Sequence, residues 1–333
     1  MKAFIIDRYG RNEKLHLQEI AEPVVKENEV LVQVFSSGVN LLDSKIKNGD
    51  FKIFLRYKMP LVLGHDVAGV ITKTGSKVSR FKVGDEVYAR PADYRIGGFA
   101  ELIAIDEANV ALKPKRLTME EAASIPLVAL TAWQALVEKA DLKKGQKVFI
   151  QAGSGGVGTI AIQLAKYIGA TVATTTGTTN VEWVKALGAD TVIDYKTEDF
   201  EGILRDYDVV LNSQDTRTLE KSLRVLKPGG KLISISGPPD AAFAKQIQLG
   251  WPLKMIMGLL SFGIRRKAKR LRIDYSFLFM RAEGNQLSKI TDLIDSGIIS
   301  PVVDKVFPFG KTEEALTYVE SGHAKGKVVI RVI

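Results

Sequence analysis

The chain has 333 residues, of which 46% are hydrophobic and 26% charged, and its formal net charge is +9. That length exceeds what one ordinary hydrophobic core accommodates, so the sequence predicts two domains. The complete absence of cysteine excludes disulfides and zinc sites built on thiolates. Only three histidines are present, and they are too scattered for a histidine-rich metal cluster.

The N-terminal segment "MKAFIIDRYG" predicts a first β-strand, because its short apolar run meets Asp7 and Arg8 at once. It lacks the pattern of a secretory signal peptide, and no apolar run in the chain reaches the length of a transmembrane helix. The sequence therefore predicts a cytoplasmic protein.

Residues 1–124 have the texture of a β-rich domain. The segments "EVLVQVFSSGVN", "LVLGHDVAGVITKTG" and "FKVGDEVYAR" show short period-2 stretches broken by Gly, Asn and Asp. From residue 125 strand-like runs alternate with helical ones, as in "KVFIQAG", residues 157–168, "TVATTTG", residues 181–187, "TVIDY", "YDVVLNS", "TLEKSLRVL" and "KLISISG". This alternation predicts an α/β fold with a parallel sheet covered by helices on both faces.

The stretch after Gly237 is less regular. It ends in "IDYSFLFM", for which the sequence predicts an edge strand of the same sheet. A helix over 283–295 follows, and "KGKVVIRVI" predicts a last strand. Because this tail has the texture of the N-terminal part, we expect the chain to return to its first domain.

Gly153, Gly155 and Gly158 stand at G-x-G-x-x-G spacing in "AGSGGVG", between a continuous strand-like run and an amphipathic helix. In this context the first glycine permits a tight turn, the second lets the backbone approach a pyrophosphate, and the third lets the helix lie close to the strand. The helix N-terminus would then present free N–H groups to the phosphates. The alternative is a structural strand-to-helix turn without a ligand.

The end of the second predicted strand indicates which dinucleotide would bind. An NAD site usually places an acidic residue there to bond the ribose 2′-OH, whereas this chain has "VATTTGTTN" and no acidic residue before Glu182. A 2′-phosphate would not be repelled, so the sequence favours NADP. The Arg or Lys that often clamps this phosphate is absent from the run, and β-propensity alone is another explanation of its threonines.

The whole chain resembles a known family, the zinc-free, quinone oxidoreductase-like (zeta-crystallin-like) branch of the medium-chain dehydrogenase/reductase superfamily. The segments that carry the resemblance occur in the family's order: "SSGVNLLDSKIKNGD", "PLVLGHDVAGVI", "FKVGDEVYA", "GGFAEL", "IPLVALTAWQAL", "AGSGGVG", "LGADTVIDY", "LKPGGKLISISG" and "KGKVVI". Each segment is weak by itself, but their order and spacing together are specific.

This resemblance implies a two-domain subunit. A GroES-like substrate domain would comprise residues 1–124 and 284–333, and a Rossmann NADP-binding domain would comprise residues 125–283. The active site would lie in the cleft between them. The family is commonly dimeric through the edge strands of its Rossmann sheets, so the segment "IDYSFLFM" would form a homodimer contact.

Carried over position by position, the resemblance implies a set of site residues. Asn40 would face the nicotinamide, and Thr131 would lie near the nicotinamide or its ribose. The other implied cofactor contacts are Gly155, Gly156 and Val157 at the pyrophosphate, Thr176 and Tyr195 at the 2′-phosphate, Ser213 and Ser236 at the ribose or nicotinamide, Phe279 and Met280 near the nicotinamide, and Lys327. Core packing is the alternative for Tyr195 and Phe279. Tyr57 is a candidate for a substrate-side hydroxyl, with an exposed or packed tyrosine as its alternative.

The sequence departs from the zinc-dependent members of that superfamily. They carry a cysteine where Asn40 stands and Gly-His-Glu where this chain has Gly64, His65 and Asp66. Catalytic zinc normally needs three protein ligands, so we expect no metal site and a packed or hydrogen-bonding His65.

Without a metal to polarise a carbonyl, the resemblance favours substrates whose own conjugation spreads the developing charge. We expect NADPH-dependent hydride transfer to a quinone or an α,β-unsaturated carbonyl. A 2-enoyl thioester reductase, or a non-enzymatic NADPH-binding or RNA-binding protein, are the alternatives. The chain has no aromatic RNP motif, so no nucleic-acid partner is expected.

Residues 255–272 join an apolar run to the cationic "RRKAKRLR". This pattern suits contact with a membrane surface that carries anionic lipid. Its alternative is a buried helix followed by a solvated basic face.

Overall fold

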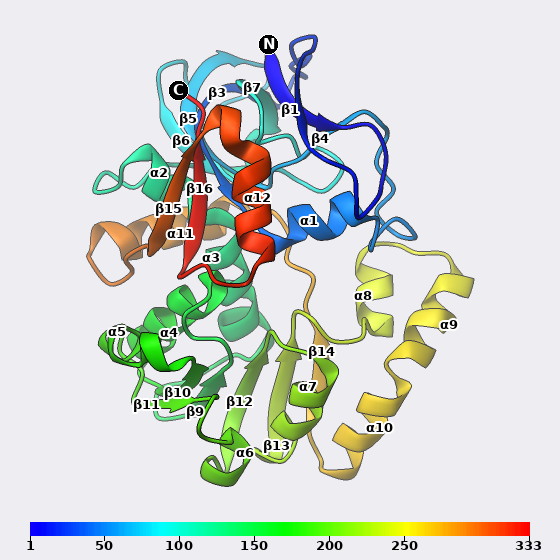
Figure 1. Cartoon of the computed structure of the whole chain (residues 1–333), viewed down its shortest axis with the longest axis vertical. Helices are drawn as coiled ribbons and strands as arrows, with labels where there is room; N and C mark the ends of the chain where they lie inside the picture. The colour runs from blue at the N-terminus through cyan, green and yellow to red at the C-terminus, as the bar shows by residue number, and fades with distance from the viewer. The chain divides into compact units, whose positions relative to one another are not determined.

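The computed structural model describes residues 1–333, and they form two compact units: unit 1 comprises Met1–Leu130 and Arg281–Ile333, and unit 2 comprises Thr131–Met280 (Figure 1). This division does not test the predicted functional domains. Their bounds, residues 1–124 with 284–333 and residues 125–283, stay a prediction.

Unit 2 is built on a six-stranded, fully parallel sheet, as the alternating pattern predicts. Its strand order is β11-β10-β9-β12-β13-β14. The strands are β9 Lys147–Ile150, β10 Thr171–Thr176, β11 Thr191–Asp194, β12 Tyr207–Asn212, β13 Leu226–Ser234 and β14 Asp274–Phe277. β14 pairs only with β13, so the segment "IDYSFLFM" does supply an edge strand.

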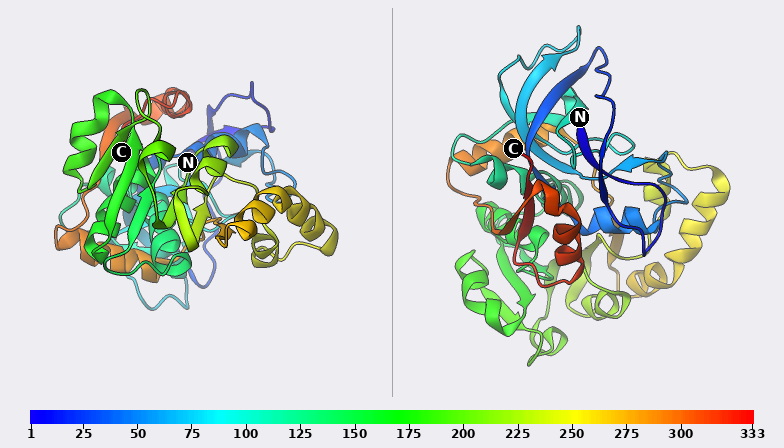
Figure 2. Two further views of the ribbon diagram at one scale, coloured as in Figure 1. Left: turned by 90° about the horizontal axis from the view of Figure 1, so that it is seen from below. Right: turned by 45° about the horizontal axis from the view of Figure 1, so that its top comes forward.

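Helices connect these strands and cover the sheet (Figure 2). They are α4 Gly156–Ile168, α5 Val181–Ala186, α6 Phe200–Ile203 and α7 Thr216–Ser222, with a 3₁₀ turn η3 at Thr178–Asn180. Gly155 caps the N-terminus of α4 and Gly169 caps its C-terminus, and the left-handed backbone of Gly169 (φ 90°) is the usual helix terminator. Its apolar residues recur at helical spacing, so one side of the helix packs on the sheet.

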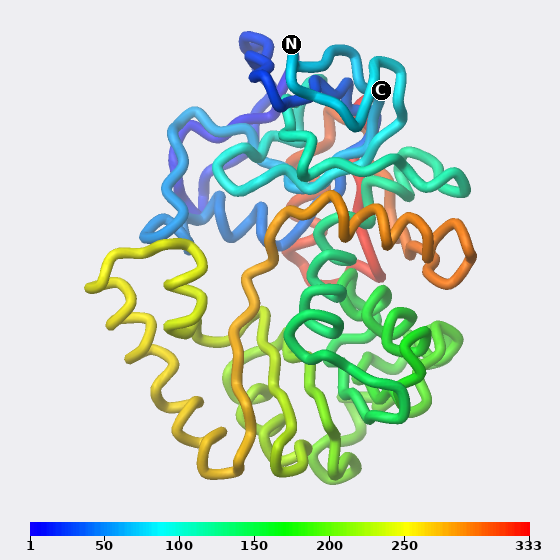
Figure 3. Tube along the Cα trace, turned by 180° about the vertical axis from the view of Figure 1, so that it is seen from behind, coloured from blue at the N-terminus to red at the C-terminus, as the bar shows by residue number.

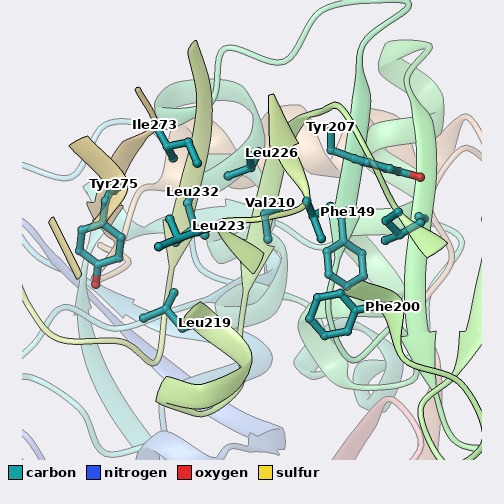
Figure 4. Close-up of a cluster of buried hydrophobic side chains, with 14 of the residues drawn as sticks. Phe149, Phe200, Tyr207, Val210, Leu219, Leu223, Leu226, Leu232, Ile273 and Tyr275 are labelled. Atoms are coloured by element: carbon teal, nitrogen blue, oxygen red, sulfur yellow. The ribbon is translucent and has the colours of Figure 1, made fainter. Parts of the chain in front are cut away.

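A large core of unit 2 lies between the sheet and helices α6, α7 and α10 (Figure 4). Phe149 of β9 stacks against Phe200 of α6, with ring centroids 4.9 Å apart. Leu219 and Leu223 of α7 are buried in the same cluster. This packing fixes α6, α7 and α10 against the strands of the sheet.

The stretch after Gly237, irregular in sequence, contains three helices: α8 Ala241–Gln246, α9 Trp251–Leu260 and α10 Phe262–Arg270. The tube trace shows α9 and α10 following one another along the outer edge of unit 2 (Figure 3). None of the helices of the chain combines the length and the apolar character that a membrane span requires.

Unit 1 is β-rich, as predicted. A seven-stranded sheet runs β15-β16-β3-β5-β6-β8 with β7 paired to β3, and a second sheet runs β2-β1-β4. The strands are β1 Lys2–Ile6, β2 His16–Glu19, β3 Glu29–Val39, β4 Leu61–Val62, β5 Asp66–Thr74, β6 Glu86–Ala89, β7 Leu102–Asp106, β8 Val110–Leu112, β15 Val303–Pro308 and β16 Lys327–Arg331. β16 pairs with β3, so the C-terminal tail does return to the first unit.

The remaining helical segments have between 3 and 12 residues. They are α1 Leu41–Asn48, η1 Glu107–Asn109, α2 Met119–Ala123, α3 Pro126–Trp133, a π-helical turn η2 at Gln134–Lys139, α11 Gly284–Asp295, η4 Phe309–Lys311 and α12 Thr312–Glu320. α11 confirms the helix predicted over 283–295. The backbone carbonyl of its Leu287 accepts a hydrogen bond of 2.8 Å from Tyr88, which ties this late helix to β6 of the same unit.

Candidate active site

The glycine loop of unit 2 joins β9 to α4, and its three motif glycines differ in their surroundings. A Cβ on Gly158 would lie 2.2 Å from the carbonyl oxygen of Ala152, and one on Gly153 would lie 2.4 Å from Thr174 Oγ1. Real Cβ atoms do not approach that closely, so both glycines serve close packing. A Cβ on Gly155 would meet a single atom, the Ala152 carbonyl oxygen at 3.3 Å. The second glycine therefore leaves an open surface.

The tight turn of this loop is made by a residue that the sequence reasoning did not single out. Ala152 adopts a left-handed backbone with φ 53°, whereas Gly153 does not. Ala152 N–H donates to Thr175 Oγ1 at 3.2 Å, and Gly153 N–H donates to the Thr175 carbonyl at 2.9 Å. These two bonds to β10 hold the loop in place.

The N-terminus of α4 has the properties of an anion site. Its N-cap, Gly155, provides no side-chain hydrogen bond, and its first turn contains no acidic residue. The first N–H groups of a helix have no partner within the helix and carry a partial positive charge. Together with the open surface at Gly155, they fit a pyrophosphate.

The end of β10 lies beside the first residues after β11. Thr176 is buried, and its hydroxyl has no hydrogen-bond partner. A Cβ on Gly177 would lie 3.4 Å from the hydroxyl of Tyr195 and 3.7 Å from Cε of Lys196. Tyr195 is 63% exposed, so the alternative that it is a core residue is wrong. An unpartnered hydroxyl, an exposed phenol and a lysine thus gather at this strand end.

Two charged residues here were missed from the sequence. Asp194, the last residue of β11, pairs in register with Thr176. Hydrogen bonds from the Thr178 side chain and the Lys196 backbone lower the pKa of Asp194, so it is anionic at neutral pH. Lys196 adds the cation that the threonine-rich run lacks. The signal that locates Lys196 is its place directly after Tyr195.

A chain of buried hydrogen bonds links the carboxyl ends of three strands. Asn212 of β12 donates to Gln151 Oε1 (2.7 Å) and accepts from Ser234 of β13 (2.6 Å). Gln151 in turn donates to Ser222 at 2.6 Å. Buried amides specify one geometry when all their groups are paired, so this chain fixes the strand ends relative to one another.

Ser213 and Ser236, the two predicted serines, stand at the rim of that chain. Ser236 is exposed and donates to the Gln214 carbonyl at 2.6 Å. Ser213 is half-buried, and its hydroxyl lies 3.4 Å from the Gln151 carbonyl. Both follow a parallel strand at its carboxyl end, where nucleotides bind in such sheets.

The other predicted residues of unit 2 are buried. Phe279 is 9% exposed and packs against Phe243, with ring centroids 5.4 Å apart. Met280 is 7% exposed, and Thr131 of α3 is 4% exposed. Their contacts with a nicotinamide stay predictions.

In unit 1, Asn40 belongs to a buried network of opposite charges. Lys327 Nζ lies 3.1 Å from the Val39 carbonyl, 2.5 Å from Asn40 Oδ1 and 3.1 Å from Asp66 Oδ2. Asn40 Nδ2 donates to the same Asp66 oxygen at 2.9 Å. An ammonium has three protons, and all of them have acceptors here. Lys327 thereby fixes which way the Asn40 amide points; its contact with the cofactor stays a prediction.

A second buried carboxylate extends this network. Asp43 Oδ1 lies 2.6 Å from His65 Nδ1 and accepts from the Gly64 N–H at 3.0 Å, while Asp43 Oδ2 accepts from the Asn40 N–H at 2.9 Å. Asp66 Oδ1 accepts from Leu127 N–H at 2.6 Å. His65 is therefore a hydrogen-bonding core residue, one of the two roles expected for it.

Tyr57, the candidate substrate-side hydroxyl, is 7% exposed. Its hydroxyl has no hydrogen-bond partner, and burial raises its pKa. A depression of about 710 Å³ is lined by Arg8, Tyr9, Arg56, Tyr57, Lys58 and Met59. Tyr57 therefore stays protonated at neutral pH and borders a concave, cationic surface of unit 1.

Replacing Tyr57 with phenylalanine distinguishes a substrate-side hydroxyl from a tyrosine that only packs. An unpaired buried hydroxyl costs about 1–3 kcal/mol, so Tyr57→Phe should raise the free energy of unfolding by about 1 kcal/mol, measured by urea titration. If Tyr57 only packs, the reduction rate stays unchanged. A rate at least tenfold lower, with the fold intact, would make it a proton donor.

Comparison with known proteins places these features in a family. Residues 26–115 match the family "Alcohol dehydrogenase GroES-like domain", and residues 187–330 match "Zinc-binding dehydrogenase". The Danio rerio protein named "NAD(P)H oxidoreductase RTN4IP1, mitochondrial" is 35% identical over all of this chain and 92% of its own length. The chain belongs to the medium-chain dehydrogenase/reductase superfamily.

Two further relatives define the branch. The Arabidopsis thaliana protein "NADPH-dependent alkenal/one oxidoreductase, chloroplastic" is 35% identical, over 99% of this chain and 79% of its own. The structure of the quinone oxidoreductase from Coxiella burnetii has a TM-score of 0.83 at 28% identity, covering 100% of this chain and 99% of that one. The resemblance to the quinone oxidoreductase-like branch, the GroES-like domain and the Rossmann domain are confirmed.

Members of this superfamily described as zinc-binding raise the question of a metal, and the side chains here do not fit one. No three histidine, aspartate or glutamate side chains are grouped so that they could hold a metal ion. Lys327 forms an ion pair with Asp66, and Asp43 contacts Nδ1 of His65. The position of a thiolate ligand is held by Asn40, whose amide is bonded to both Lys327 and Asp66. A cation beside these groups would have to displace the ammonium.

Proposed function

We propose that this medium-chain dehydrogenase/reductase catalyses the NADPH-dependent, zinc-independent reduction of a quinone or an α,β-unsaturated carbonyl. The observation that carries the proposal is the loop after β9, where packed glycines leave the uncapped N-terminus of α4 and the open surface of Gly155 to a pyrophosphate. When bound, the reduced nicotinamide supplies the hydride, and solvent or a protein hydroxyl supplies the proton. The relatives named alkenal/one and quinone oxidoreductases support this substrate class.

Within this proposal the residues of the chain bind and orient. Gly153, Gly155, Gly156, Val157 and Gly158 form the pyrophosphate loop. Thr176 and Tyr195 receive the adenosine 2′-phosphate, and the unpartnered Thr176 hydroxyl offers it a donor. The remaining proposed contacts toward the ribose and nicotinamide are Asn40, Thr131, Ser213, Ser236, Phe279, Met280 and Lys327.

The test of this function is a fluorescence titration with NADPH and with NADH, followed by turnover. We expect micromolar binding of NADPH and at least tenfold weaker binding of NADH, which corresponds to about 1.4 kcal/mol. Benzoquinones and alkenals should then oxidise NADPH in the presence of a chelator as fast as in its absence. Binding of neither nucleotide would refute the proposal, and loss of turnover with the chelator would refute its zinc-independent part.

Lys196 provides a sharper test of the 2′-phosphate position. Reversing its charge with Lys196→Glu should weaken NADPH binding at least tenfold, because a carboxylate would then face the phosphate at short range. NADH lacks that phosphate, so its affinity should change less than twofold. Lys144→Glu, at another exposed lysine of unit 2, is the matched control. An equal loss for both nucleotides would instead indicate a disturbed fold.

One alternative function has an observation in its favour. The concave surface beside Tyr57 carries the cations Arg8, Arg56 and Lys58, which would suit the phosphates of a 2-enoyl thioester. Turnover of crotonyl-coenzyme A at a rate equal to that of alkenals, lost on reversing Arg56 and Lys58, would favour this thioester reductase.

The homodimer, the membrane contact and the cytoplasmic location stay predictions. A homodimer through β14 is supported by the free outer edge of that strand, and light scattering of the pure protein tests it.

Contact of residues 255–272 with a membrane surface is supported by the exposure of that segment. The cytoplasmic location stands beside relatives that are named mitochondrial and chloroplastic, and imaging of the tagged protein in its native cell tests it.

A further inference from the structure

Helices α9 and α10 follow one another along the outer edge of unit 2 (Figures 1 and 3). They meet at Ser261, whose backbone is itself close to helical (φ −88°, ψ −4°). The pair therefore behaves as one bent helix of 20 residues. At 1.5 Å per residue its length is roughly 30 Å.

One side of this helix pair anchors it to unit 2. Met257, Ser261, Ile264 and Ala268 are all buried and recur every three or four residues. Residues at that spacing share a face. Ile264 and Ala268 belong to the large core of the unit. The helix pair is thus held on a single inward stripe.

The opposite side forms a surface that we call the outward stripe. It consists of Trp251, Met255, Leu259 and Phe262, followed at the same spacing by Arg266, Lys269 and Arg270. The apolar members are 72%, 58%, 71% and 58% exposed. Single exposed apolar residues are ordinary, but four large ones in a row mark an interaction surface.

The charge of the protein is concentrated in the same segment. Residues 241–273 contain eight lysines and arginines and no acidic residue, so they carry +8 of the net +9 of the chain. Of the cations on α10, only Lys267 has an ion-pair partner, Glu220 of α7. The outward stripe therefore runs from an apolar end to a cationic end.

We propose that the outward stripe is a docking surface for an anionic phospholipid bilayer. The helix pair would lie in the plane of the membrane, with Trp251, Met255, Leu259 and Phe262 entering the boundary between headgroups and acyl chains. Tryptophan favours that boundary because one part of its ring is apolar and the indole N–H is polar. Arg266, Lys269 and Arg270 would face the lipid phosphates. The inference does not depend on the proposed reaction.

Two other partners fit these observations less well. A second copy of the chain would bring an identical cationic segment against this one, and like charges across an interface are repulsive. A nucleic acid would suit the cations but would leave the four large apolar side chains without an apolar partner. A bilayer with anionic headgroups complements both ends of the stripe.

The first experiment is co-sedimentation of the full-length protein with vesicles. Vesicles of phosphatidylcholine with added phosphatidylglycerol should bind the protein, and vesicles of phosphatidylcholine alone should bind it at least tenfold more weakly. Raising the salt concentration should reduce binding, because salt screens the headgroup charge. Failure to bind the anionic vesicles, or equal binding to both kinds, would overturn the proposal.

Paired variants then test the two ends of the stripe. Met255→Gln with Leu259→Gln, and Arg266→Gln with Lys269→Gln and Arg270→Gln, should each lower binding, the triple variant by about 100-fold. The matched controls change equally exposed residues elsewhere: Val24→Gln with Val83→Gln, and Lys52→Gln with Lys82→Gln and Lys144→Gln. They should stay within twofold of the parent. Equal losses in the controls would refute a specific surface.

Trp251 reports the position of the apolar end. Its emission should shift to the blue on vesicle binding, and Trp251→Phe should abolish most of the shift while retaining most of the binding. Retention of the full shift in Trp251→Phe would overturn the insertion of this residue. A different result would be that the parent protein does not bind vesicles and that Met255→Gln with Leu259→Gln dissociates a dimer. The outward stripe would then be an interface between copies, and the proposal would be wrong.

Discussion

Lys327→Met is expected to lower the free energy of unfolding of unit 1 by about 3–5 kcal/mol, because it leaves buried Asp66 without its cation. The Asp66 side chain is fully buried, and Lys327 is its only ion-pair partner. The same change removes the donor that orients the Asn40 amide. We therefore also expect the rate of NADPH-dependent substrate reduction to fall at least tenfold. The affinity of this variant for NADPH should fall by a smaller factor.

All three tryptophans lie in unit 2, so tryptophan fluorescence does not report on unit 1. Hydrogen exchange of the β3 amides is the suitable measurement for this prediction. Lys325→Met, two residues away and exposed, is the matched control and should be neutral. Adding Asp66→Asn to Lys327→Met should recover part of the stability, since it removes the unpaired charge. A Lys327→Met protein with parental exchange rates would show that the network is not a stabilising one.

Gly158→Ala and Gly155→Ala are expected to impair the protein in different ways. At Gly158 the new methyl would lie 2.2 Å from the Ala152 carbonyl and 2.8 Å from Gly153 Cα. Both are backbone atoms, so α4 must move away from the loop. We expect a loss of about 1–3 kcal/mol in stability and at least 100-fold weaker binding of both NADPH and NADH.

At Gly155 the methyl meets only the Ala152 carbonyl oxygen, at 3.3 Å, and otherwise points into open space. Gly155→Ala should therefore fold with stability within about 1 kcal/mol of the parent. It should still weaken both nucleotides about tenfold, because the methyl stands where the backbone would approach the pyrophosphate. Thermal unfolding and nicotinamide fluorescence measure the two effects separately. Parental nucleotide affinity in Gly155→Ala would contradict the assignment of this loop.

The parallel sheet was predictable from sequence because its strands are short apolar runs that alternate with amphipathic helices. The phosphate loop was predictable because its three glycines have the G-x-G-x-x-G spacing and stand between a strand and an amphipathic helix. At such a junction the close approach of the backbone leaves little room for side chains. That reasoning assigned the turn to Gly153, whereas Ala152 takes the left-handed backbone. A hydrogen bond from its N–H to Thr175 supports that conformation, and such a partner lies 23 residues away in sequence.

The parts that sequence could not provide depend on long-range contacts. Lys196 reaches Gly177 only because β11 lies beside β10. The Gln151 to Asn212 bond joins residues 61 positions apart. For residues 255–272, periodicity left a buried helix and a membrane contact open, because an apolar run has the same composition in a core and on a surface. Met255 and Leu259 are 58% and 71% exposed, so the apolar part of this segment is not fully buried.

Because the positive charge is concentrated in residues 241–273, the net charge of this protein can change independently of its fold. The isoelectric point of about 9.4 arises mainly from this segment, which contains α8, α9 and α10. A few substitutions there would bring the whole molecule near neutrality without touching the nucleotide loop or the Asn40 network. Chains of this fold can therefore differ widely in electrophoretic and ion-exchange behaviour while keeping the same chemistry.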